Sequence, residues 1–242
     1  MLYGEFCILT IMMASWSTNF IHQTINAFVF HMFIFLALFS HLKTMLTDPG
    51  AIPKGNATDE YIHRLQSAQN SIIYKCAKCS SIKPERAHHC SICGRCVRRM
   101  DHHCPWVNNC VGEANQKYFI LFTMYIALLS LHTLYWSICQ FLFCVGEEWQ
   151  GCSMFGPPVT SVLLIFLLFE ATLFAIFTLV MFSTQLSSIC NDQTAIESFR
   201  SLMPGPNGWK NIQMLFGGPF SIKWFSPFIA PYRSKPSFEY SV

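Results

Sequence analysis

Cysteine and histidine residues crowd into one stretch of this 242-residue chain. Seven of the twelve cysteines and four of the nine histidines lie between residues 76 and 110. Cysteines spaced by two residues are a common zinc-binding element, because both thiolates can reach one tetrahedral ion. Three such pairs overlap here, namely Cys76/Cys79, Cys90/Cys93 and Cys93/Cys96. One pair alone is weak evidence, but this density strongly predicts metal binding.

The stretch contains more candidate ligands than two zinc ions need. It offers eleven cysteine and histidine side chains, whereas two closed tetrahedral sites use about eight. Three groups are then left over, so that one thiol is available for other chemistry. The spacing alone fits a purely structural zinc loop with incidental spare residues equally well.

The residues around Cys104 are typical of an activated nucleophile. Asp101 and His102 come just before it in the sequence. A free thiol has a pKa near about 8.5 and is only slightly ionised at neutral pH. A neighbouring base, with a group that orients it, supplies the missing activation. The same trio fits a zinc-binding histidine and the carboxylate that holds it equally well.

The remaining sequence predicts a membrane protein. Hydrophobic residues make up 52% of the chain and charged residues only 12%, against about 25% charged in soluble domains. Four apolar segments can be distinguished: Leu2–Ala14, Ile25–Leu46, Tyr118–Cys144 and Val159–Ile189. The first is too short to cross about 30 Å of hydrocarbon as a helix. It is either part of a longer natural helix, the interpretation that we favour, or an interfacial segment beside three full spans. The triplet Asp48-Pro49-Gly50 is expected to end the second helix.

The predicted fold is an α-helical polytopic membrane protein with four transmembrane helices, the first short or truncated. Its expected parts are the first two helices (1–46), a zinc-binding loop (47–117), the last two helices (118–189) and a tail (190–242). All sixteen Lys and Arg residues lie between Lys43 and Lys117 or after Phe199. Because basic flanks mark the cytoplasmic side, the loop and the tail are predicted to be cytosolic. Cytosolic thiols stay reduced and available to metal.

The short segment between the last two helices is then expected to face the lumen or the exterior. It contains Glu147 and Glu148, and Cys144 and Cys152 flank it and could form a disulfide. The sequence starts without a basic segment or a small-residue cleavage site, so no cleavable signal peptide is expected.

Residues Cys76 to Phe119 resemble the cysteine-rich domain of DHHC protein S-acyltransferases, the enzymes that palmitoylate cysteines of other proteins. The matching positions are Cys76, Cys79, Pro84, Arg86, His89, Cys90, Cys93, Cys96, Asp101, His102, His103, Cys104, Trp106, Asn109, Cys110, Gly112, Asn115 and Phe119. The Asp48-Pro49-Gly50 triplet and Asn211 followed by Phe216-Gly217 extend the resemblance over nearly the whole chain. It is most similar to the Golgi-type members with a short tail.

The resemblance implies two interleaved structural zinc sites and a separate nucleophile. The first site would use Cys76, Cys79, His89 and Cys96, and the second Cys90, Cys93, His103 and Cys110. His102 would be the general base, oriented by Asp101, and Cys104 the nucleophile. This assignment agrees with the ligand count, because Cys104 remains unused by metal.

One motif departs from the family pattern. The family sequence after the last helix is Thr-Thr-x-Glu, whereas this chain reads Thr194-Ala195-Ile196-Glu197. The second hydroxyl is absent, and so is any contact that this hydroxyl would make to Asp101. Thr194, Glu197 and Asn211 are expected to have structural roles.

The predicted function is transfer of a palmitoyl group from acyl-CoA to Cys104 and then to cysteines of membrane-associated substrate proteins. Arg95, Arg98 and Arg99 are candidates to bind the CoA phosphates, although a solvated basic face beside anionic lipid explains each one as well. Trp106 is expected to pack against the acyl chain or to anchor at the interface. The expected partners are the lipid bilayer, acyl-CoA and protein substrates, with no nucleic acid, and the resemblance implies Golgi localisation.

Two other functions compete with this one. A zinc-organised scaffold similar to a RING adaptor lacks its final Cys-x-x-Cys pair here and leaves Cys104 unexplained. A transporter is less favoured, because Glu170 is the only acid inside a long apolar segment. The C-terminal Tyr240-Ser241-Val242 weakly resembles a ligand of PDZ domains.

Overall fold

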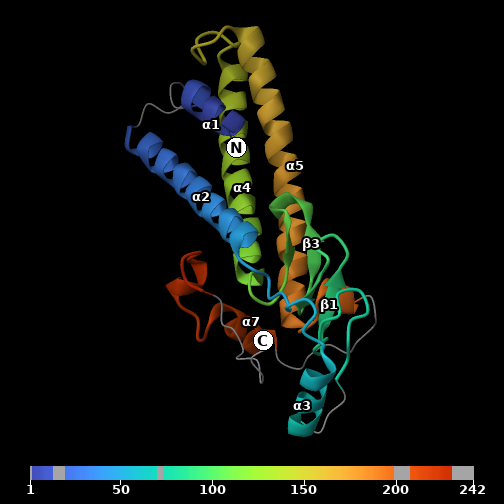
Figure 1. Ribbon diagram of the computed structural model, residues 1–242. Helices are drawn as coiled ribbons and strands as arrows, with labels where there is room; N and C mark the ends of the chain where they lie inside the picture. The colour runs from blue at the N-terminus through green and yellow to red at the C-terminus, as the bar shows by residue number, and fades with distance from the viewer. Residues whose placement is uncertain (1, 13–19, 70–72, 199–207, 231–242) are drawn as a thin grey trace. The chain divides into compact units, whose positions relative to one another are not determined.

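The computed structural model describes residues 2–12, 20–69, 73–198 and 208–230 (Figure 1). The chain forms two compact units. The first consists of residues 1–39 and 122–183, and the second of residues 40–121 and 184–242. The helices α2 (Phe20–Leu46), α4 (Gln116–Gly146) and α5 (Pro157–Cys190) contribute residues to both units. The predicted C-terminal PDZ ligand lies outside the described residues.

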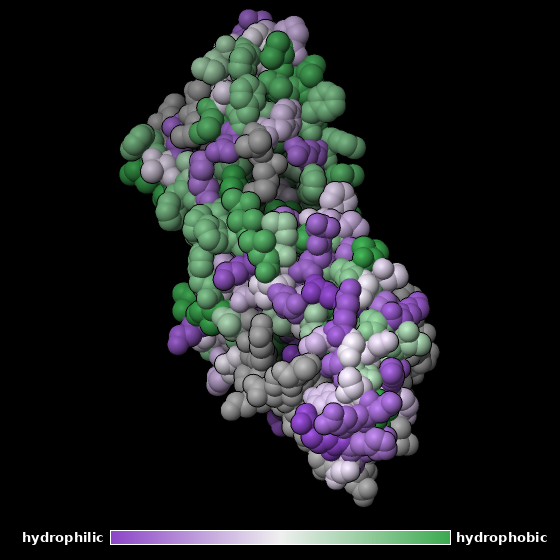
Figure 2. All heavy atoms as spheres, in the orientation of Figure 1, coloured by the Kyte–Doolittle hydropathy of each residue, from purple (hydrophilic) through white to green (hydrophobic). Residues whose placement is uncertain are grey.

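The first unit is built from apolar helices. Among the described residues, α2, α4 and α5 are the three helices long and apolar enough to cross a membrane. Their 27, 31 and 34 residues exceed the roughly 20 that a span requires. Hydrophobic side chains gather over their outward surface (Figure 2), and rings such as Phe28, Phe166 and Phe169 are mostly exposed. Exposed aromatic rings on long helices are expected where the surrounding solvent is lipid.

The first predicted segment is helical but short, as the sequence indicated. It forms an α-helix, α1 (Leu2–Cys7), followed by a π-helix (Ile8–Met12). The other three predicted segments agree with α2, α4 and α5 to within five residues at each end. The second helix ends at Leu46, just before Asp48-Pro49-Gly50. Asp48 Oδ1 accepts the N–H groups of Gly50 and Ala51 and so closes this turn.

Polar contacts and a covalent link join the elements of the first unit. Asn26 Oδ1 of α2 accepts hydrogen bonds from His132 Nε2 and Trp136 Nε1 of α4, at 3.2 and 2.9 Å. A disulfide joins Cys144, in the last turn of α4, to Cys152 in the loop that leads to α5. This disulfide confirms the sequence prediction for the loop.

The second unit contains short strands with little apolar core between them. Strand β1 (Ala87–Cys90) pairs antiparallel with β2 (Arg95–Arg98), and β3 (His102–Cys104) with β4 (Asn109–Val111). A 3₁₀ turn (Pro105–Val107) separates β3 from β4. The helices of this unit are α3 (Asp59–Gln69), α6 (Ala195–Ser198) and α7 (Gly208–Phe216), with a 3₁₀ turn at Ile222–Phe225. The buried clusters are small and made partly of cysteines, which is typical of a metal-stabilised fold.

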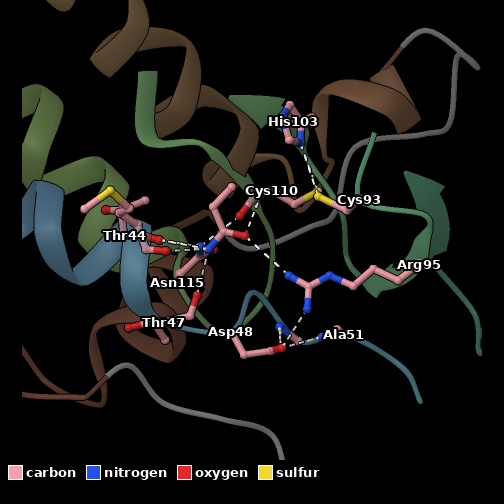
Figure 3. A network of polar contacts seen from close by, with 12 residues as sticks. Thr44, Thr47, Asp48, Ala51, Cys93, Arg95, His103, Cys110 and Asn115 are labelled. Atoms are coloured by element: carbon pink, nitrogen blue, oxygen red, sulfur yellow. Dashed lines mark hydrogen bonds and ion pairs between the residues drawn. The ribbon is translucent and has the colours of Figure 1, made fainter. Parts of the chain in front are cut away.

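Two asparagines attach the strands to the end of α2. Asn109 Nδ2 donates to the carbonyls of Thr44, Met45 and Thr47, at 2.9 to 3.2 Å. Asn115 Nδ2 donates to Thr44 O at 3.1 Å, a contact visible in Figure 3. The last carbonyls of a helix have no partner within it. These side chains therefore supply hydrogen-bond donors to the carbonyls at the end of α2 and fix the position of β4.

Candidate active site and metal-binding clusters

Eight cysteine and histidine side chains converge in two groups of four. The groups are Cys76, Cys79, His89 and Cys96, and Cys90, Cys93, His103 and Cys110. Within each group all ligand atoms lie within 4.8 Å of one another. The closest sulfur–sulfur and sulfur–Nδ1 distances are 3.4 to 4.0 Å. Zinc bonded at about 2.3 Å to sulfur and about 2.0 Å to nitrogen places its ligands about 3.5 to 3.8 Å apart. Both groups therefore fit zinc.

Strand pairing explains why the two groups are interleaved along the sequence. Each group contains one pair of facing residues from neighbouring strands, His89 with Cys96 and His103 with Cys110. His89 and Cys90 are consecutive in β1, and successive strand residues point to opposite faces. One strand thus supplies a ligand to each group.

The same alternation separates Cys104 from the metal ligands. In β3, His103 points to one face, whereas His102 and Cys104 share the other. Cys104 is buried and lies outside both groups of converging ligands. The thiol that ligand counting left over is therefore outside both ligand sets and interacts with His102.

Asp101 and His102 form a hydrogen-bonded pair beside this thiol. His102 Nδ1 lies 2.8 Å from Asp101 Oδ2, and Asp101 is only 1% exposed. The other ring nitrogen, Nε2, is buried and has no hydrogen-bond partner among the described residues. The carboxylate thus fixes the ring so that Nδ1 is the donor and Nε2 is left to exchange a proton.

The electrostatics of the trio favour an ionised thiol. Burial raises the pKa of Cys104, but its interactions with His102 and with the N–H groups of Val107 and Trp106 outweigh burial and lower that pKa overall. Burial lowers the pKa of His102, but the hydrogen bond with Asp101 and the nearby thiol raise it to about 9. Burial also raises the pKa of Asp101, yet the donors His102, Ala195 and Gln185 bring it below its usual value. Both shifts favour transfer of the thiol proton from Cys104 to His102.

Two groups outside the cysteine-rich stretch also hold Asp101. The backbone N–H of Ala195 donates to Oδ1 at 2.7 Å, and Gln185 Nε2 donates to Oδ2 at 2.7 Å. The contact from Ala195 uses the main chain, so it does not need the hydroxyl that this sequence lacks. Sequence reasoning missed Gln185. Its one signal is that it is the only glutamine in α5, in a short polar stretch at the end of a long apolar helix.

Arg86 fixes the segment that carries Ala195. Its guanidinium forms a bidentate salt bridge with Glu197, in which the Nε–Oε1 and Nη2–Oε2 distances are both 2.7 Å. It also bonds the side chain and the carbonyl of Asp192. Glu197 Oε2 in turn accepts the N–H of Thr194 at 2.9 Å. Thr194 and Glu197 are thus joined to each other within this segment, and Asn211 Nδ2 donates to Cys190 O at 3.1 Å.

The three arginines expected to meet CoA phosphates all have carboxylate partners. Arg95 pairs with Asp48 at 3.1 Å, as Figure 3 shows. Arg98 pairs with Glu113 at 3.2 Å, and Arg99 pairs with Asp192. A phosphate would have to share or displace these carboxylates. The Trp106 side chain is 75% exposed, and its carbonyl contacts His41 Nε2 at 3.0 Å.

Together these features define a membrane-embedded protein with two Cys₃His clusters and a buried cysteine activated by an Asp–His pair. The family model for DHHC palmitoyltransferase matches residues 69–202, more than half of the chain. The chain therefore belongs to the DHHC palmitoyltransferase family, and the resemblance inferred from the sequence is confirmed.

Individual relatives extend this similarity beyond the family domain. Over 237 residues the chain is 54% identical to palmitoyltransferase ZDHHC3 of Homo sapiens, covering 97% of this chain and 79% of the relative. Palmitoyltransferase ZDHHC7 of Rattus norvegicus is 54% identical over 230 residues, 94% of this chain and 74% of the relative. Probable protein S-acyltransferase 12 of Arabidopsis thaliana is 34% identical over 205 residues, with coverage of 78% and 68%.

Proposed function

We propose that this protein transfers a palmitoyl or similar long-chain acyl group from acyl-CoA to Cys104 and then to cysteines of substrate proteins. The observation that carries the proposal is that Cys104 lies outside both metal clusters, on the same strand face as His102. His102 is held by Asp101 at 2.8 Å, as a general base requires.

The reaction has two thiol exchanges. In the first, Cys104 Sγ gives its proton to His102 Nε2, and the thiolate attacks the thioester carbon of acyl-CoA. The bond from that carbon to the CoA sulfur breaks, and CoA leaves with the proton from His102. In the second, a substrate cysteine gives its proton to His102 and attacks the acyl group, and Cys104 is released as a thiol. Both steps exchange one thioester for another, so the residues need only position the reactants and manage one proton.

The two clusters would hold structural zinc. Each offers three thiolates and one imidazole, a closed set that leaves no position for water or substrate, so zinc would supply stability and shape the loop. The acyl tail belongs in the bilayer, since each buried CH₂ gains about 0.8 kcal/mol. Trp106 would pack against the acyl chain or lie at the membrane interface, and Arg95, Arg98 and Arg99 would bind the CoA phosphates.

The proposed orientation places residues 47–117 and 190–242 in the cytosol, because the basic residues cluster there. The Cys144–Cys152 disulfide supports this, since its loop would then face an oxidising compartment. Golgi residence is proposed from resemblance to Golgi-type members, and imaging of tagged protein with a Golgi marker tests it. A PDZ partner at the C-terminus is tested by deleting Val242.

The proposal is tested by incubating purified protein with labelled palmitoyl-CoA. We expect a label that hydroxylamine releases and that Cys104→Ser abolishes. Cys190→Ser is the matched control, since Cys190 is a half-buried cysteine at the end of α5 and should leave the label unchanged. Label that survives in Cys104→Ser would refute the nucleophile. A correctly folded wild type that never takes label would favour a non-enzymatic scaffold.

A further inference from the structure

Gln185 is a buried amide that the reaction above does not use. It lies in the last two turns of α5, in the stretch Ser183–Ser188 where four of the other five residues are Ser or Thr, and it is 4% exposed. Its Nε2 donates to Asp101 Oδ2 at 2.7 Å. The contact joins residues 84 positions apart in sequence, so it connects the membrane-spanning helix directly to the Asp–His pair.

The contact falls on the oxygen that matters most for His102. Asp101 Oδ2 accepts both Gln185 Nε2 and His102 Nδ1, at 2.7 and 2.8 Å. Among the described residues, the other oxygen, Oδ1, accepts a hydrogen bond only from the Ala195 N–H, at 2.7 Å. Three donors on the two oxygens prevent the carboxylate from rotating about the Cβ–Cγ bond of Asp101. Without Gln185, Oδ2 would be held by His102 alone, which is the group that it must orient.

Stability alone does not account for a glutamine here. Gln185 Oε1 is buried and has no hydrogen-bond partner among the described residues. An unpaired buried carbonyl is unfavourable, and an apolar side chain of the same size would avoid that cost. The amide is therefore explained by what its Nε2 holds and not by the packing of α5.

We propose that Gln185 is a positioning residue that fixes the carboxylate of Asp101 so that His102 Nε2 faces Cys104. The inference rests on the proposed function of Cys104 and deepens it. Gln185 would act through its contact with Asp101 and not on the thiol or the acyl donor. Its loss should slow the acylation step without weakening the binding of acyl-CoA.

The test compares Gln185→Met with wild type in the self-acylation of Cys104. Methionine has nearly the same length and no donor. We expect the rate at saturating palmitoyl-CoA to fall about tenfold or more, as when other groups that orient a catalytic side chain are removed. The KM for palmitoyl-CoA should change less than about twofold, and zinc content and melting temperature should not fall. Ser187→Ala, an exposed position two residues away in α5, should behave as wild type.

A double variant separates positioning from a general structural effect. If Gln185 acts through Asp101, adding Gln185→Met to Asp101→Asn should cost little further rate, because the carboxylate is already gone. Gln185→Asn, which keeps the amide but shortens its reach by one methylene, should resemble Gln185→Met. Three results would each overturn the inference. They are wild-type rates in Gln185→Met and Gln185→Asn, a multiplicative loss of rate in the double variant, and a loss of zinc that parallels the loss of rate. Failure of wild type itself to acquire label would instead count against the proposed function.

Discussion

Replacing Arg86 should loosen the segment that holds Asp101 and so weaken both the fold and the acylation of Cys104. Arg86 makes two hydrogen bonds to Glu197 and two to Asp192, at 2.6 to 3.0 Å. Glu197 fixes the N–H of Thr194, and the next residue, Ala195, donates to Asp101. The arginine therefore reaches the active site through one short stretch of backbone.

The magnitude follows from the unequal burial of the two partners. The side chain of Glu197 is 5% exposed and that of Arg86 is 29% exposed. Leaving a buried charge without its partner costs about 3 to 5 kcal/mol. Because Arg86 is partly solvated, we expect Arg86→Ala to fall at the lower end, near about 3 kcal/mol. Arg86→Lys keeps the charge but loses the bidentate geometry, which should lower the free energy of unfolding by about 1 to 2 kcal/mol.

Thermal unfolding of the detergent-solubilised protein measures these losses. At about 2 to 4 °C per kcal/mol for a chain of this size, Arg86→Ala should melt about 6 to 12 °C below wild type, and Arg86→Lys about 2 to 8 °C below it. The rates of self-acylation should fall in the same order. Arg64→Ala is the control, because Arg64 lies on α3 over the ring of Tyr61 and should change melting by little. An Arg86→Lys protein with the melting temperature and rate of wild type would refute this reasoning.

Three further predictions concern acid, metal and close packing. Burial raises the pKa of Glu197, but Arg86 and the Thr194 N–H lower that pKa overall. The stabilisation from the ionised carboxylate is therefore fully present above the unfolded-state pKa and is lost as the pH falls through the folded-state pKa. The melting difference between wild type and Glu197→Gln should shrink as pH falls below about 4.5. Removing zinc with a chelator should unfold the loop and abolish self-acylation, with both restored by added zinc; activity that survives complete zinc removal would contradict a structural role. A Cβ on Gly112 would lie 2.7 Å from both Pro49 O and Val97 Cγ1, so Gly112→Ala should reduce folded yield strongly, whereas Gly146→Ala, with open space around it, should not.

The features that could be predicted from the sequence are those that depend on residues close together in the chain. Apolar runs gave α2, α4 and α5 because a span requires a long uninterrupted segment. The surplus of ligands around Cys104 was countable because cysteine spacing is local. The division of the eight ligands into two sets came from the family resemblance, and alternation in β1 now explains why neighbours such as His89 and Cys90 serve different clusters.

The contacts that sequence could not supply join residues far apart in the chain. Gln185 and Ala195 reach Asp101 across 84 and 94 positions, and no periodicity marks them as neighbours. The missing hydroxyl at Ala195 suggested a lost contact, whereas the backbone N–H supplies one regardless of side chain. Ion pairing of Arg95 with Asp48 was equally hidden, because charge alone does not distinguish a phosphate ligand from a partner within the fold.

Native mass spectrometry after exposure to palmitoyl-CoA tests the central claim most directly, because one spectrum reports both metal and acyl adducts on the same molecule. Wild type should carry two zinc ions and one acyl group, and Cys104→Ser should carry two zinc ions and no acyl group. A Cys104→Ser protein that has lost zinc, or that still gains the acyl mass, would contradict a thiol that is free of metal and accepts the acyl chain.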